Sequence, residues 1–129
     1  MTGIDTNIIV RLLTGDDPSQ AEKAKAVFKK SVVFIPETVI LETEWVLRHA
    51  YSFAPFAIHQ AFTKLFGLSN VRLADSHRML TALQWYAEGV DFADALHLAQ
   101  SQTCSGFLSF DRKFVQKALG KGSCKVREP

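Results

Sequence analysis

Residues 2–13 spell TGIDTNIIVRLL, and this segment predicts a short strand, Thr2–Asp5, followed directly by a helix, Thr6–Leu13, which a glycine ends. Asp17 and Pro18 predict the start of the next helix, because aspartate is a favoured N-cap and proline suits the first helical position. The chain therefore begins with one strand that leads into two consecutive helices.

The alternation of short apolar strands and helices continues to the end of the chain. Further strands are predicted at residues 32–35, 71–73 and 106–110, with a last edge strand at 125–127. Further helices are predicted at 17–30, 37–51, 55–67, 76–88, 92–102 and 112–119. Alternating strands and helices predict a parallel sheet with helices on both faces. We therefore expect an α/β fold, a three-layer α/β/α sandwich with a central parallel sheet.

The composition is typical of one globular domain. The chain has 129 residues, too few for two domains with separate cores, and 47% of them are hydrophobic, so we expect a single domain over residues 1–129. No apolar run reaches the roughly 18 residues of a membrane span, and the first residues lack the basic and apolar parts of a secretion signal. We expect Cys104 and Cys124 to be reduced, and the protein to be cytoplasmic without a membrane partner.

Basic residues gather in two places, although the net charge of +2 is too small to identify a partner. Such groups either bind the phosphates of a nucleic acid or form a solvated helix face and a loose tail. The sequence leaves both interpretations open. The first group is Arg112, Lys113, Lys117, Lys121, Lys125 and Arg127, with no acidic residue between them, and the second is Lys23, Lys25, Lys29 and Lys30.

Three aspartates stand where a predicted strand ends or a predicted helix begins. Asp5 ends the first strand, and Asp111 follows the strand at 106–110. Asp94 lies in the first turn of the helix predicted at 92–102, after the glycine at position 89 that ends the preceding helix. In open parallel sheets the ligand crevice lies at the carboxyl ends of the strands, so Asp5 and Asp111 should share one rim. Each aspartate can also be an ordinary helix cap, and Asp91 with Asp94 has the spacing of a capping arrangement.

Glu42 is harder to explain as a structural residue. Its helical neighbours include Val39, Trp45 and Val46, so its face of the helix is apolar and should point inward. Glutamate is almost never buried without a partner, which favours a pocket in front of Glu42. Glu44, by contrast, has Arg48 four positions later and is expected to form a surface ion pair.

Four carboxylates on one rim, those of Asp5, Glu42, Asp94 and Asp111, would repel one another without a counter-charge. Mg²⁺ or Mn²⁺ meets this need, because both cations take oxygen ligands and keep several waters. Such an ion can activate water and hold a phosphate for in-line displacement, which fits hydrolysis of a phosphodiester. The sequence offers no Ser–His arrangement and no histidine at zinc-ligand spacing.

Four segments, in order along the chain, resemble the motifs of PIN-domain ribonucleases. They are IDTNIIVRLL at 4–13, VILETEWVL at 39–47, VDFADALHLA at 90–99 and LSFD at 108–111. The resemblance spans nearly the whole chain and looks closest to the VapC-type toxins of bacterial toxin–antitoxin pairs. It implies a PIN fold, dependence on Mg²⁺ or Mn²⁺, and endonucleolytic cleavage of single-stranded RNA. It also implies a homodimer and a neutralising antitoxin that inserts a segment near the active site.

The resemblance further implies roles for individual residues. Asp5 and Asp94 correspond to the main metal ligands, and Glu42 and Asp111 complete the catalytic cluster. The expected supporting residues are Thr6 and Asn7 around the first acid, Ser109 at a position where the family often has threonine, and Asp91 as a further acid or helix cap. Arg11, Arg112 and Lys113 are candidates for contacts with RNA phosphates, with surface solvation as the alternative.

Two other functions fit parts of the sequence. A non-catalytic RNA- or protein-binding module on the same fold would use the basic groups, but four acids beside RNA would weaken its binding. A phospho-acceptor receiver or a phosphatase would use an aspartate at a strand end. Such a phosphatase usually has a second aspartate two residues later, where this chain has Asn7, and a receiver needs an early acidic pair.

Overall fold

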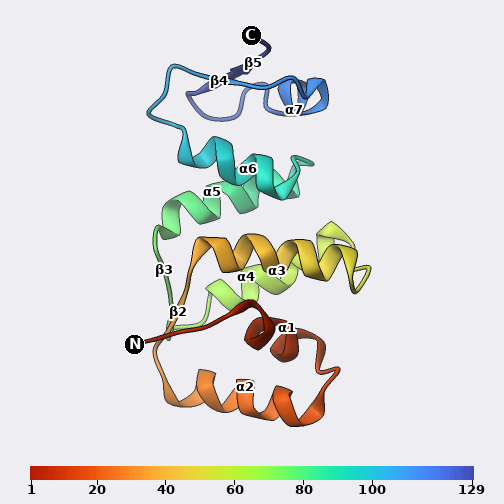
Figure 1. The fold of residues 1–129 in the computed structure, drawn as a ribbon. Helices are drawn as coiled ribbons and strands as arrows, with labels where there is room; N and C mark the ends of the chain where they lie inside the picture. The colour runs from red at the N-terminus through yellow and green to blue at the C-terminus, as the bar shows by residue number, and fades with distance from the viewer. The chain divides into compact units, whose positions relative to one another are not determined.

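The computed structural model describes residues 1–129 as two compact units, Met1–Ala74 and Asp75–Pro129 (Figure 1). Each unit contains helices and its own set of parallel strands. None of the helices is both long enough and apolar enough to cross a bilayer.

The first unit contains a three-stranded parallel sheet with the order β1-β2-β3, flanked by helices. Thr2 pairs with Val33, and Val33 with Val71. Two helices connect each strand to the next and bring the chain back to the end of the sheet where the first strand began. Parallel strands require such a long connection. The strands are β1 (Thr2–Gly3), β2 (Val33–Ile35) and β3 (Val71–Leu73), and the helices are α1 (Thr6–Thr14), α2 (Pro18–Lys30), α3 (Glu37–His49) and α4 (Pro55–Phe66).

Local capping fixes the turn from β1 into α1. Asp5 is the N-cap of α1, and its side chain accepts a hydrogen bond of 2.7 Å from the Thr6 backbone N–H. At the other end Gly15 adopts a left-handed backbone with φ 64°, a conformation that glycine adopts without a steric penalty. Ile4 and Ile9 are buried on either side of the turn. The apolar neighbours anchor the backbone, and the Asp5 carboxylate stays at the carboxyl end of β1.

The second unit contains a pair of parallel strands, β4 and β5, in which Gly106 pairs with Lys125. Its helices begin at aspartate N-caps, namely Asp75, Asp91 and Asp111. The elements are α5 (Ser76–Ala87), α6 (Phe92–Gln100), β4 (Gly106–Leu108), α7 (Arg112–Lys117) and β5 (Lys125–Arg127). The third of these helices follows β4 directly, so Asp111 stands just beyond the strand, as Asp5 does in the first unit.

The α/β class is confirmed, and every predicted strand and helix is present with shifts of a few residues at its ends. The strand predicted at 106–110 ends at Leu108, although the Ser109 N–H still donates to the Arg127 carbonyl over 3.1 Å. Both cysteines are free, with Cys124 buried and Cys104 exposed. The strands fall into two parallel sheets, β1-β2-β3 and β4-β5. That residues 1–129 form a single domain stays a prediction.

Candidate active site

Asp5 and Glu42 line one open hollow of the first unit, which has a volume of about 400 Å³. Asp5 comes from the carboxyl end of β1, and Glu42 comes from the middle of α3. Both carboxylates are exposed to solvent. We call this hollow the acid hollow; it is lined by Asp5, Thr6, Asn7, Val10, Arg11, Glu42, Val46, Ala50 and Tyr51.

Thr6 contacts both carboxylates of the acid hollow. Its backbone N–H donates to Oδ1 of Asp5, and its hydroxyl Oγ1 donates to Oε1 of Glu42. Thr6 is buried, with only 7% of its surface exposed, so the surrounding core holds this residue in place. One rigid threonine therefore orients two acids that lie far apart in the sequence. Asn7, the other expected neighbour of the first acid, is exposed and lines the same hollow.

The burial predicted for Glu42 is wrong, and Glu44 is the buried glutamate of α3. Glu44 is only 1% exposed, whereas Trp45 is 57% exposed and Glu42 is exposed as well. The inward face of α3 carries Ile40, Thr43, Glu44 and Leu47, which repeats every three to four residues as a buried helical face does.

The ion pair between Glu44 and Arg48 is therefore largely internal and not the surface pair that we expected. Arg48 donates from Nε to Oε2 over 2.8 Å and from Nη2 to Oε1 over 3.2 Å, in a two-pronged contact. Because Glu42 is exposed, burial is no longer a reason to place it in a pocket. Its place in the acid hollow rests instead on the Thr6 contact and on the shape of the surface.

The second unit brings together three further acids. Asp91 is the N-cap of α6 and accepts a hydrogen bond of 3.4 Å from the Asp94 N–H, while Asp111 caps α7 by accepting from the Phe114 N–H over 3.1 Å. Asp94 lies in the first turn of α6 and is half-buried. The capping roles that the sequence allowed for Asp91 and Asp111 are thus real, and they leave Asp94 without one.

The three acids of the second unit interact electrostatically. Burial raises the pKa of the Asp94 carboxyl, repulsion from Asp91 and then Asp111 raises it further, and His97 opposes the shift. A carboxyl with a raised pKa among other carboxylates is a group whose charge a cation would stabilise.

The remaining predicted site residues lie on the second unit around Asp111. Ser109 accepts a hydrogen bond of 3.0 Å on its hydroxyl from the Asp111 N–H, so it shapes the turn that presents this acid. Arg112 forms an ion pair with Glu128 at 3.1 Å but is still 87% exposed. Lys113 is exposed. Both basic side chains are open to solvent, as contacts with a large substrate require.

The donor set suits a hard divalent cation. All the predicted ligands are carboxylates, and Mg²⁺ and Mn²⁺ prefer oxygen donors over nitrogen or sulfur. Within either unit, no three side chains of histidine, cysteine, aspartate or glutamate gather closely enough to hold a metal ion by themselves. The predicted ligands fall two in each unit, with Asp5 and Glu42 in the first and Asp94 and Asp111 in the second. Their convergence on one ion stays a prediction.

Sequence reasoning missed Tyr51 as a residue of the acid hollow. Tyr51 follows the end of α3, and its hydroxyl contacts Arg11 and Asp16 near the start of the chain. Nothing in the sequence around Tyr51 points to these partners, because they lie far away along the chain.

Comparison with known families identifies the family of the chain. The family profile described as PIN domain matches residues 4–119, a range that includes all four predicted catalytic acids and most of both units. A comparison with curated proteins finds no match. PIN domains are typically metal-dependent nucleases. Because the match extends over residues 4–119, which is most of the chain, the chain belongs to the PIN domain family.

Proposed function

We propose that this chain is an endoribonuclease that depends on Mg²⁺ or Mn²⁺ and acts as the toxin of a toxin–antitoxin pair. The observation that carries the catalytic part is the pairing of Asp5 and Glu42 in one hollow through a single buried threonine. The raised pKa of Asp94, which lies near Asp91 and Asp111 in the second unit, also supports the catalytic part of the proposal. The toxin role rests on the resemblance of the four motifs.

Asp5, Glu42, Asp94 and Asp111 would hold the metal ion. When bound, the ion supplies Lewis-acid chemistry, namely activation of water and neutralisation of charge on the phosphate. The residues of the chain do the positioning. Thr6 keeps two of the acids oriented, and Ser109 shapes the turn before a third. The exposed cations Arg112 and Lys113 are available to bind the RNA backbone.

A cleavage assay on labelled single-stranded RNA tests the catalytic proposal. The purified chain should cut the RNA inside the strand with Mg²⁺ or Mn²⁺ and lose this activity in EDTA. Asp5→Asn and Asp94→Asn should abolish cleavage, whereas Glu22→Gln, a change at a 73% exposed helix position, should not alter it. Calorimetric titration with Mn²⁺ gives an independent readout, because both inactive variants should bind the ion more weakly. Equal cleavage by the wild type in EDTA would refute the mechanism.

The partners are tested separately from the chemistry. We propose a homodimer, a cognate antitoxin and a cytoplasmic location, all from the family resemblance. Expression of the wild-type chain in a bacterium without antitoxin should slow growth, and the Asp5→Asn chain should not. Light scattering on the purified chain should give the mass of a dimer. A chain that binds RNA with any metal yet never cuts it would instead be the non-catalytic binding module.

A further inference from the structure

The acid hollow adjoins a second hollow on the surface of α1 and α2. The second hollow has a volume of about 260 Å³ and is lined by Asn7, Ile8, Arg11, Gln20 and Lys23. It contains two cations and no acid. Asn7 and Arg11 line both hollows, so Arg11 stands at the boundary between an acidic region and a basic one.

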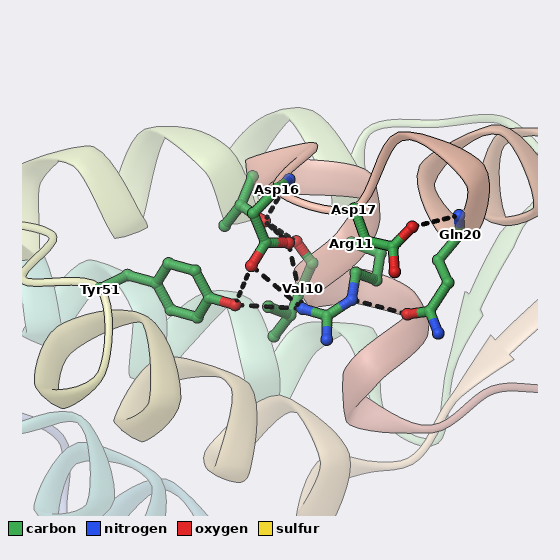
Figure 2. A network of polar contacts seen from close by, with 7 residues as sticks. Val10, Arg11, Asp16, Asp17, Gln20 and Tyr51 are labelled. Atoms are coloured by element: carbon green, nitrogen blue, oxygen red, sulfur yellow. Dashed lines mark hydrogen bonds and ion pairs between the residues drawn. The ribbon is translucent and has the colours of Figure 1, made fainter.

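Three side chains from different parts of the first unit hold the Arg11 guanidinium. Nη1 donates to the Asp16 carboxylate over 3.1 and 3.3 Å and to the Tyr51 hydroxyl over 3.1 Å. Nε donates to Oε1 of Gln20 over 2.7 Å. The Tyr51 hydroxyl in turn donates to Asp16 over 2.6 Å, which closes the network (Figure 2). The plane of the guanidinium is therefore set from two sides.

The network leaves one edge of the guanidinium without a partner. Arginine has five N–H donors, and the two on Nη2 make no hydrogen bond with any residue of the chain; Figure 2 draws this nitrogen without a contact. Lys23 is exposed and forms no ion pair. An oriented pair of N–H donors next to a free ammonium group is well suited to phosphate oxygens on a flexible strand.

The anionic member of the network stays charged at neutral pH. Hydrogen bonds from Tyr51, then from Thr14, together with the charge of Arg11, lower the pKa of the Asp16 carboxyl. Asp16 is therefore a fixed acceptor for Arg11. A guanidinium that is held in advance loses less conformational freedom when a ligand arrives, so the network lowers the cost of binding.

We propose that Arg11 and Lys23 form a track for the sugar-phosphate backbone of the RNA substrate, which leads away from Asp5 and Glu42, and that Tyr51, Asp16 and Gln20 position Arg11. This inference rests on the proposed ribonuclease function, since it places successive phosphates of one strand beside the acid hollow. The competing explanation is that the network only ties the turn after α1 to the end of α3.

The salt dependence of RNA binding tests the track. Affinity of a fluorescein-labelled single-stranded RNA of mixed sequence is measured by anisotropy in EDTA at several salt concentrations, with gels to confirm that the RNA is intact. Each lost phosphate contact should reduce the slope of log K against log salt by about 0.7, so Arg11→Met and Lys23→Met should each lose about 0.7 and their combination about 1.4. Lys30→Met, at the other end of α2 and outside both hollows, is the matched control and should keep the wild-type slope.

A double-mutant cycle tests the positioning residues. Tyr51→Phe keeps the ring and removes the hydroxyl, so it should weaken RNA binding while leaving the salt slope unchanged. In the Arg11→Met background the same change should have no further effect on RNA affinity, because Tyr51 acts through Arg11. Arg11→Lys keeps the charge and loses the fork, so it should keep the slope and bind less tightly.

The outcomes separate this inference from the proposed function. If the wild type neither binds nor cuts RNA, the ribonuclease function fails. If the wild type binds and cuts RNA but Arg11→Met and Lys23→Met keep its salt slope, the track is refuted and the function stands. If Tyr51→Phe lowers the urea midpoint but not RNA affinity, the network is only a structural tie. Circular dichroism of each variant excludes misfolding, and Arg11→Lys serves where Arg11→Met does not fold.

Discussion

Replacing Arg48 by methionine should destabilise the chain markedly, although Arg48 itself is only half-buried. The substitution keeps the aliphatic length of the side chain and removes the two hydrogen bonds that Arg48 donates to Glu44. The Glu44 side chain is only 2% exposed, so water cannot readily replace the lost donors. The cost comes from leaving a charge inside the protein with fewer partners.

The size of the effect follows from the burial of the two partners. Breaking a fully buried ion pair by removing one member costs about 3–5 kcal/mol. The Arg48 side chain is 32% exposed, so some water reaches its place in the variant, and we expect a loss of about 2–3 kcal/mol. For a chain of this size that corresponds to a fall in Tm on the order of 6–15 °C.

Urea denaturation followed by circular dichroism measures this loss, with two companion variants. Glu22→Gln changes a glutamate of α2 whose side chain is 73% exposed and should alter the free energy of unfolding by less than about 0.5 kcal/mol. Replacing both partners, Glu44→Met with Arg48→Met, should recover much of the stability, because neither charge of this pair is then left without the other. An Arg48→Met chain as stable as the wild type, or a double variant worse than the single one, would refute the reasoning.

Three further predictions concern the acids and the first helix. In EDTA at pH 7, Asp94→Asn should be more stable than the wild type, because the raised pKa means that the folded state disfavours the charged Asp94 carboxylate. The advantage of the variant should shrink as the pH falls toward 3.8, the ordinary pKa of an aspartate, where the wild-type carboxyl becomes protonated. A variant less stable than the wild type at pH 7 would contradict this. Thr6→Val removes the hydroxyl that donates to Glu42 and should reduce RNA cleavage by about 10–100-fold. Cleavage equal to that of the wild type would show that this hydrogen bond does not contribute to activity. Gly15→Ala should lower the free energy of unfolding by about 1 kcal/mol or more in urea titrations, since its φ of 64° strains any residue with a Cβ, and an unchanged midpoint would argue against that conformation.

Local sequence signals were sufficient to place the helices and strands. Asp17 followed by Pro18 predicts the start of α2, and Asp111 predicts the start of α7, because a cap bonds to an N–H only two or three residues later. The positions of Asp5 and Asp111 just beyond parallel strands follow from the same short-range rules. The residues that decide these features are neighbours along the chain, so no knowledge of packing is needed.

The faces of α3 show where such rules stop. The positions of the apolar residues suggested that Glu42 lies inward, yet Glu44 is buried and Trp45 is exposed. Helical periodicity shows which residues share a face, but not which face the rest of the chain covers. In α3 that choice belongs to the elements packed against it, which local sequence cannot reveal.

Contacts between distant residues were equally invisible in the linear chain. The Thr6 hydroxyl meets Glu42, and the Arg11 guanidinium meets Tyr51, only because folding brings α1 and α3 within hydrogen-bond distance of each other. Residue types along the chain were enough to predict a set of acids and the class of chemistry that they favour. Long-range packing decides which of these acids share a hollow and which basic side chain lies beside them. Side-chain hydrogen bonds extend only about 3 Å, and the separation of two residues in the sequence does not give their distance in space.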